Sequence, residues 1–338
     1  MRRFLNYAVV LLVIALLGFC IQTDYYLVRP GLAEELGSLV RVEGEPRKKE
    51  GQFFMVTVTQ HHANLWTYLY GICNPHLDIR PISTVIPPDM SPEEYGKLME
   101  DWMQESKDLA RVIALRRAGY EVPIVSDGVE VVDLMDDSPS RGILQKGDVI
   151  KAVEGRSISL AEEVVEYVQR QEAGQRIRIT LQHNETTKEV EVLTTSSQDE
   201  PHKAALGIYI RTLNRQPILP LEIDIETGPV VGSSAGMMFV LEILDRLLPG
   251  NLTGGHKIAG TGTISINEEI GSIGGVKQKV IAAENSGIEY FLVPEENFED
   301  ALQAASRLKV VSVKTLDEAL YFLQNLPVAS QAKDLAAA

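Results

Sequence analysis

Residues 228–236 read Gly-Pro-Val-Val-Gly-Ser-Ser-Ala-Gly, and they join a predicted strand at 221–226 to a predicted helix at 235–248. A glycine-rich turn at this place brings backbone N–H groups and the positive end of the helix next to Ser234. Such donors suit the oxyanion of an acyl transfer, and they suit a bound phosphate equally well. Serines at a helix start also serve simply as caps. The turn alone therefore leaves a nucleophile, a phosphate site and a helix cap open.

A second glycine turn opens residues 273–283, which read Ile-Gly-Gly-Val-Lys-Gln-Lys-Val-Ile-Ala-Ala. Positions 276, 279, 280 and 283 have the spacing of one helix face, so Lys279 lies on an apolar face and Lys277 lies off it. Burial lowers the pKa of a lysine. Lowering it from about 10.4 by roughly three units costs near 4 kcal/mol, which an apolar face can supply. Lys279, rather than Lys277, is therefore the candidate general base.

The chain around these two turns alternates strands and helices from residue 204 to residue 327, which is typical of an α/β or α+β domain. The further elements expected there are strands at 258–266, 290–293 and 309–313, and helices at 276–286, 297–306 and 316–326. Residues 328–338 are expected to form a frayed tail.

A small β-rich unit is predicted before this domain, over residues 121–195. Residues 144–150 read Leu-Gln-Lys-Gly-Asp-Val-Ile, and a helix over 160–171 and a strand over 176–182 follow them. This order resembles the PDZ domains attached to envelope proteases. A PDZ domain captures an extended peptide as an added strand, often by its C-terminal carboxylate.

Two details of the PDZ-like unit are less well marked in the sequence. Gly119-Tyr120-Glu121-Val122 is the candidate for the carboxylate-binding loop. The polar stretch 194–203 reads as a linker to the following domain. A β-rich spacer without a binding function is the alternative for the whole unit.

The amino-terminal segment predicts a membrane anchor. Residues 4–21 are apolar apart from Asn6, and this run is long enough to span a bilayer. Arg2 and Arg3 precede it, which keeps the N-terminus cytoplasmic and places the rest of the chain outside the cell membrane. A cleavable signal peptide is the rival interpretation, but no small-x-small cleavage site follows the run. Residues 1–30 are thus expected to form a cytoplasmic stub and a single transmembrane helix.

Residues 31–120 read as a separate mixed region with a strand near 53–59 and a long helix. The helix starts at a capping box formed by Ser91 and Glu94, with Pro92 in its first turn. His61 and His62 are adjacent on the strand, so they point to opposite faces and are poorly placed to share a metal ion. We therefore expect no metal site here.

Composition limits the partners and the cofactors. The chain has 338 residues, enough for two or three domains, and 32 Lys+Arg against 47 Asp+Glu give a net charge of −15. This acidic balance argues against nucleic-acid binding. The two cysteines, Cys20 and Cys73, exclude a disulfide scaffold. No Gly-x-x-x-x-Gly-Lys-Ser/Thr loop occurs, so no nucleotide cofactor is expected.

Taken together, four motifs resemble the proteolytic domain of the Lon-type Ser–Lys proteases over about residues 204–326. They appear in the order of that family and comprise the serine turn and residues 259–264, 273–279 and 291–297. With the anchor and the PDZ-like unit, the whole chain resembles the YlbL-type membrane-anchored PDZ–Lon proteases of Gram-positive bacteria. The expected fold is thus α+β, with an α/β-like proteolytic domain, a preceding PDZ-like domain and an N-terminal transmembrane helix.

The resemblance implies a role for each matching residue. Ser234 corresponds to the nucleophile, Lys279 to the general base, and Thr261 to a threonine that orients the lysine. The backbone N–H groups near Gly232 and Ser233 correspond to the oxyanion hole. The implied reaction is peptide hydrolysis through an acyl-enzyme, without metal or cofactor. The family also implies ring-like homo-oligomers.

This sequence departs from the family at two points. Many Lon proteases carry an acidic residue three positions before the serine, where this chain has Val231. The ATPase module is absent, so we expect an ATP-independent endopeptidase acting on short, flexible or unfolded proteins, among them small membrane-anchored regulators.

Three other functions are weighed against this one. The first is a non-catalytic PDZ adaptor or scaffold. A trypsin-like PDZ protease would need a His/Asp pair and a Gly-x-Ser-Gly turn, and a phosphate-binding enzyme would need further nucleotide motifs. The sequence offers neither.

Overall fold

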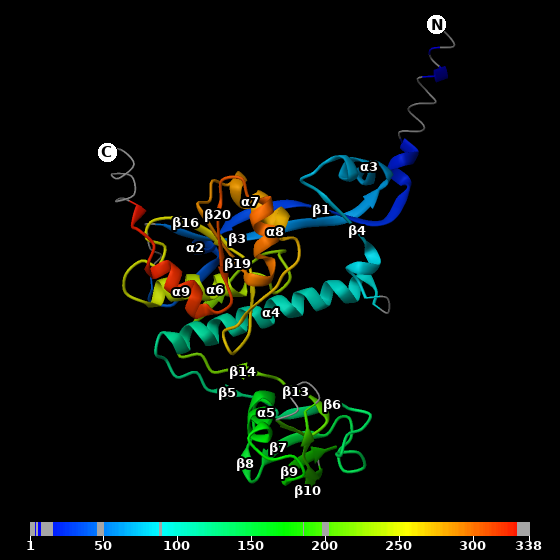
Figure 1. Ribbon diagram of the computed structural model, residues 1–338, viewed down its shortest axis with the longest axis vertical. Helices are drawn as coiled ribbons and strands as arrows, with labels where there is room; N and C mark the ends of the chain where they lie inside the picture. The colour runs from blue at the N-terminus through cyan, green and yellow to red at the C-terminus, as the bar shows by residue number, and fades with distance from the viewer. Residues whose placement is uncertain are drawn as a thin grey trace. The chain divides into compact units, whose positions relative to one another are not determined.

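The structure of the chain is a computed structural model, and it divides into two compact units (Figure 1). The split unit comprises Met1–Glu121 and Pro220–Ala338, and the inserted unit comprises Val122–Leu219. The structure describes residues 4, 6, 7, 16–45, 51–87, 90–184, 186–197 and 203–329.

A six-stranded mixed sheet forms the centre of the split unit, in the order β20-β19-β16-β3-β1-β4. Strand β3 pairs in parallel with β16, while β1 runs antiparallel to both β3 and β4. Phe53, Ile258 and Phe291 are fully buried on the parallel strands, as expected where helices cover both faces of a sheet. The strands are β1 (Gln22–Glu35), β3 (Gln52–Asn64), β4 (Asp78–Pro81), β16 (Lys257–Gly260), β19 (Tyr290–Pro294) and β20 (Lys309–Val313).

Helix α6 (Gly236–Leu247) is buried along nearly its whole length and lies against α4 (Pro92–Arg117). Its charged residues are buried as well, and two of them pair with each other, since Arg246 Nε donates to Glu242 Oε1 at 2.9 Å. The predicted capping box of α4 is confirmed, because Ser91 Oγ accepts from Glu94 N and Glu94 accepts from Ser91 N. The other helices are α2 (Leu36–Leu39), α3 (Leu65–Cys73), α7 (Val276–Asn285), α8 (Phe298–Ala304), α9 (Leu316–Gln324) and the 3-10 turns η1 (Ile82–Thr84) and η2 (Glu295–Asn297). Two short strand pairs complete the unit: β2 (Val40–Val42) with β15 (Ile223–Ile225), and β17 (Thr263–Ile264) with β18 (Ile270–Gly271).

The inserted unit has its own sheet, β10-β9-β7-β6-β13, and its own core. Val129, Ile150, Ile177 and Leu181 pack in that core and are all buried. The elements are β5 (Ile124–Val125), β6 (Val129–Leu134), β7 (Val149–Val153), β8 (Arg156–Ser157), α5 (Ala161–Gln169), β9 (Arg176–His183), β10 (Thr186–Leu193), β11 (Thr195–Ser196), β12 (Ala204–Ala205), β13 (Ile208–Thr212) and β14 (Gln216–Pro217). The strand–loop–helix–strand order predicted for the PDZ-like domain is present.

The division into a split unit and an inserted unit corrects the expected domain boundaries. Residues 31–120 are not a separate region, because β1, β3 and α4 belong to the same unit as the serine and lysine turns. The β-rich unit does not end at the polar stretch 194–203. Thr195 and Ser196 pair with Ala205 and Ala204, and β13 then joins the sheet beside β6. The inserted unit thus interrupts the other in sequence, and the strand pairings that reveal this join residues far apart along the chain.

Most of the predicted anchor lies outside the described residues. Of residues 4–21, the structure describes 4, 6, 7 and 16–21, and β1 begins immediately afterwards at Gln22. Residues 22–30, which were expected to belong to the stub and anchor region 1–30, instead lie in β1. Within the described ranges, no helix is both long enough and apolar enough to cross a membrane. The expected tail at 328–338 is described only for its first two residues.

Candidate active site

Helix α7 carries Lys279 into the interior of the split unit. Gly275 precedes the helix with φ of +71°, a left-handed conformation that favours glycine. The predicted face is confirmed, since Val276, Lys279 and Val280 are buried and Lys277 is exposed. The Lys279 side chain is only 3% exposed. The apolar spacing in the sequence therefore identified which of the two lysines is buried.

The serine turn leads into α6 without a side-chain cap. Ala235 is the N-cap residue of α6, and no side-chain hydrogen bond caps the helix. The interpretation of both serines as helix caps is therefore wrong. Gly232 has φ of +93°, which turns the chain sharply before Ser233 and Ser234. Val231 is exposed, so the position that is acidic in many Lon proteases faces solvent here.

Ser234, Lys279 and Thr261 form a connected group of hydrogen bonds. Lys279 Nζ donates to Ser234 Oγ at 2.7 Å and to Thr261 Oγ1 at 2.8 Å. The hydroxyl of Thr261 donates to the carbonyl oxygen of Ser234 at 3.0 Å, which leaves its lone pairs facing the lysine. The N–H of Gly262 donates to the same carbonyl at 2.8 Å. Strand β16 and the turn after it thereby hold the serine turn and the lysine together.

The pKa of Lys279 is lowered to about 7 by burial of its side chain. Desolvation disfavours the charged ammonium, and the two groups that contact Nζ are neutral hydroxyls. A substantial fraction of the amine is therefore unprotonated at neutral pH. An unprotonated amine at 2.7 Å from a hydroxyl is in reach to accept its proton.

The backbone of the serine turn offers two N–H groups for an oxyanion. The N–H of Gly232 donates to the carbonyl oxygen of Met99 at 2.9 Å, so the expected role of Gly232 in an oxyanion hole is wrong. No acceptor among the described residues takes the N–H of Ser233 or of Ser234. These two groups lie beside the nucleophile and before the positive end of α6.

Helix α4 supports the serine turn, a contact that no pattern in the sequence predicts. Besides the Met99 carbonyl, Ser106 Oγ donates to the carbonyl oxygen of Ser233 at 3.2 Å. The capping box predicted that α4 forms, but not which turn it packs against.

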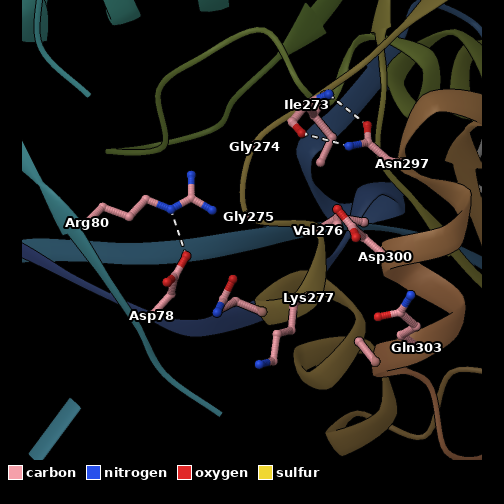
Figure 2. A pocket seen from close by; sticks show the side chains of 12 residues that line it. Asp78, Arg80, Ile273, Gly274, Gly275, Val276, Lys277, Asn297, Asp300 and Gln303 are labelled. Carbon is pink, nitrogen blue, oxygen red and sulfur yellow. Dashed lines mark hydrogen bonds and ion pairs between the residues drawn. The ribbon is translucent and has the colours of Figure 1, made fainter. Parts of the chain in front are cut away.

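Lys277 lies on the surface, away from Ser234 and Thr261. It lines a depression of about 500 Å³ with Asp78, Arg80 and Asp300, shown in Figure 2. At its rim the Asn297 side chain accepts from the N–H of Ile273 at 2.8 Å and donates to the carbonyl of Ile273 at 3.0 Å. Asn297 thus fixes the turn from which α7 starts.

The inserted unit has an apolar depression of about 110 Å³ between α5 and β13. Strand β13 pairs with β6 on one side and ends the sheet on the other. Val165 and Val168 of α5 face Ile208 and Ile210 of β13 across this depression. Such an edge strand beside a helix is what an added peptide strand requires.

The loop that leads into β13 is at one end of this depression. Gly207 has φ of +67°, and Ser140 Oγ donates to the carbonyl of Leu206 at 2.6 Å. The prediction that Gly119–Val122 forms the carboxylate-binding loop is wrong. The N–H groups of Gly119 and Tyr120 donate to carbonyl groups in the last turn of α4, in the split unit. Residues 204–207 instead line the depression and lead into β13.

Two parts of the chain match known protein families. Residues 164–324 match the Lon protease (S16) C-terminal proteolytic domain, and residues 105–194 match the PDZ domain. The chain is 33% identical over 132 residues to a Lon protease of Lachnoclostridium phytofermentans, covering 35% of this chain and 16% of that protein. It is 32% identical over 115 residues to Lon protease 2 of Bacillus subtilis, covering 33% and 20%. The matched region thus spans a fifth or less of these relatives.

Among solved structures, the chain is similar to the PDZ domain of an SdrC-like protein of Listeria monocytogenes. The identity is 24%, with 25% of this chain and 87% of that chain covered, and the TM-score is 0.23.

Proposed function

The chain carries a Lon-type (S16) proteolytic domain and a PDZ domain, and from this we propose that it is an ATP-independent, membrane-anchored serine endopeptidase with a Ser234–Lys279 dyad. The observation that carries the proposal is the 2.7 Å hydrogen bond between a buried lysine amine and Ser234 Oγ. A structural lysine would instead be expected to pair with a carboxylate or to reach solvent.

The first step is activation of the serine. The unprotonated amine of Lys279 accepts the proton of Ser234 as Oγ attacks the carbonyl carbon of a peptide bond. Thr261 holds the amine by its hydrogen bond and so keeps the nitrogen lone pair directed at the serine. Negative charge develops on the peptide oxygen, and the N–H groups of Ser233 and Ser234 stabilise it.

The second step releases the products. The ammonium of Lys279 returns its proton to the leaving amine, which yields an acyl-enzyme on Ser234. A water molecule then attacks the ester, Lys279 again accepts a proton, and the serine is regenerated. No metal or cofactor takes part in either step.

Substrate selection follows from the PDZ domain and from the lack of an ATPase motif. Without an unfolding motor, the enzyme acts on flexible or already unfolded segments. The groove between α5 and β13 captures an extended chain end and presents the rest of the substrate to the dyad. The apolar run 4–21 and the preceding arginines support an extracytoplasmic catalytic domain near the membrane. Ring-like homo-oligomers stay a prediction from the family.

Cleavage of unfolded α-casein by the full chain, without ATP, tests this function. We expect the wild type and Ser233→Ala to cleave, and Ser234→Ala to lose activity by on the order of a thousandfold or more. Circular dichroism and thermal melting verify that each variant is folded. No cleavage by the folded wild type, with or without a peptide that fills the PDZ groove, would contradict the protease and favour a non-catalytic PDZ adaptor.

A further inference from the structure

Helix α3 presents an apolar face to solvent. Its sequence, Leu-Trp-Thr-Tyr-Leu-Tyr-Gly-Ile-Cys, contains no charged residue. Leu69 is 46% exposed, and Tyr70 and Ile72 are each 60% exposed. Leu69, Ile72 and the exposed Cys73 have the i, i+3, i+4 spacing of one helix face. We call Leu69, Tyr70, Ile72 and Cys73 the outer face of α3.

The opposite side of α3 is packed on the sheet. Gly71 is buried, and a side chain there would collide with Leu27 of β1 and Ile79 of β4. At the N-terminus, the Asn64 side chain caps the helix by accepting from Thr67 N at 2.9 Å. The helix is therefore held rigidly with its outer face away from the core.

Helix α3 starts beside the end of the predicted anchor. The N–H of Leu65 donates to the carbonyl of Ile21 at 3.0 Å. The Trp66 indole fills the space beside Gly18, within the apolar run. Figure 1 shows α3 next to the segment that enters β1. The described residues just before β1 are also exposed and apolar: Leu16, Leu17, Phe19 and Ile21.

We propose that the outer face of α3 lies in the boundary between headgroups and acyl chains of the membrane that holds residues 4–21. This proposal rests on the proposed membrane anchor and deepens it. A helix that begins where a spanning run ends is brought to the bilayer surface by the chain itself. Tyrosine and tryptophan side chains are enriched at that depth, because their rings are apolar and their tips are polar.

The contact gives the catalytic domain a fixed attachment. One spanning helix alone would leave the split unit free to tilt. A second apolar contact, rigidly joined to β1 and β4, restrains the orientation of the unit that carries the Ser234–Lys279 dyad. The enzyme would then favour substrate segments close to the membrane surface.

Depth-dependent quenching in lipid vesicles tests the contact on the full chain. A Cys20→Ser variant leaves Cys73 as the only cysteine, and NBD attached there reports on the outer face of α3. Phosphatidylcholine vesicles with a spin label near the headgroup should quench this probe by about half or more. The matched control moves the cysteine to α8, with Cys20→Ser, Cys73→Ser and Glu299→Cys, and we expect little quenching there.

A second reporter separates the outer face of α3 from the end of the anchor. In a Trp102→Phe variant, Trp66 is the only tryptophan, and it contacts Gly18 in the run itself. Trp66 lies in the first turn of α3, beside Gly18. Brominated lipids that quench Trp66 while the NBD at Cys73 stays unquenched would therefore place only this end of the helix in lipid, overturn the proposal for the outer face and leave the anchor intact. If Trp66 is also unquenched and the protein does not float with the vesicles, both fail. Casein cleavage, read in parallel, tests the protease independently.

A substitution on the outer face completes the test. Leu69→Ser combined with Ile72→Ser should lower NBD quenching at least about twofold, with flotation and casein cleavage unchanged. Unchanged quenching in this variant would contradict burial of the outer face in lipid. An NBD signal that is quenched only by a second labelled copy would assign the face to self-association instead.

Discussion

Lys279 Nζ lies 2.7 Å from Ser234 Oγ and 2.8 Å from Thr261 Oγ1, so both of its hydrogen-bond partners are uncharged hydroxyls. A carboxylate at either place would stabilise the ammonium and raise the pKa of the lysine. With hydroxyls there, burial acts without compensation, and the pKa falls to about 7. Burial, with no carboxylate in contact to offset it, therefore leaves a substantial fraction of this lysine unprotonated at neutral pH.

Replacement of the two lysines of α7 by arginine should separate their roles. A guanidinium does not lose its proton in proteins, so Lys279→Arg keeps a positive charge but supplies no base. We expect the casein-cleavage rate of Lys279→Arg to fall by on the order of a thousandfold. Lys277→Arg is the matched control, and because Lys277 is exposed it should keep nearly full activity. Equal losses in the two folded variants would argue against Lys279 as the base.

The pH profile of cleavage should follow the deprotonation of Lys279. Only the neutral amine accepts the serine proton, so kcat/KM should rise about tenfold per pH unit below a midpoint near 7 and level off above it. Initial rates with a fluorogenic peptide between pH 5 and 9 measure this. A midpoint near the ordinary lysine value of about 10.4 would contradict a desolvated base.

The free energy of unfolding should depend on pH through the same protonation of Lys279. Between about pH 7 and pH 10.5 the unfolded chain holds a proton on Lys279 that the folded chain has lost. Wild-type stability should therefore rise with pH in this window, by about 1.4 kcal/mol per pH unit, relative to Lys279→Met. Urea unfolding of both proteins at pH 7.5 and 9 measures the difference. A constant gap between them would mean that folding does not shift the pKa of this lysine.

Thr261 is a positioning residue, and Thr261→Val should reveal its contact with the lysine. The hydroxyl accepts from Lys279 Nζ, and a hydrogen bond to an ammonium is stronger than one to a neutral amine. Its loss should lower kcat by roughly 10- to 100-fold and move the pH midpoint below 7. Thr263→Val on β17, two residues away, is the control. A lower rate with an unmoved midpoint would indicate only a packing defect.

Local patterns predicted the buried lysine of α7 and the long helix α4, but not which strands pair to complete the split unit. The helical spacing of Val276, Lys279 and Val280 and the Ser91 capping box are each contained within a few residues. The parallel pairing of β16 with β3 joins residues 257 and 52, and no local signal encodes such a pairing. Its consequence, that the PDZ unit is an insertion, was therefore missed. The Met99 carbonyl that occupies the N–H of Gly232 was missed for the same reason.

Occupation of the groove in the inserted unit should depend on Val165 of α5. Val165 is 42% exposed and lines the depression beside β13, so a carboxylate there would repel an apolar or anionic peptide end without disturbing the core. We expect Val165→Asp to weaken binding of a peptide with an apolar residue at its free C-terminus by about tenfold or more. Leu193→Asp, at a similarly exposed apolar residue of β10, is the matched control and should bind as the wild type does. Fluorescence anisotropy with the labelled peptide measures the affinity of both variants.

An amidated copy of the peptide tests whether its C-terminal carboxylate contributes to binding. Equal affinity of Val165→Asp and Leu193→Asp would place the peptide site elsewhere. If amidation leaves the affinity unchanged, the loop at 204–207 does not bind a carboxylate. The groove would then take internal segments rather than chain ends.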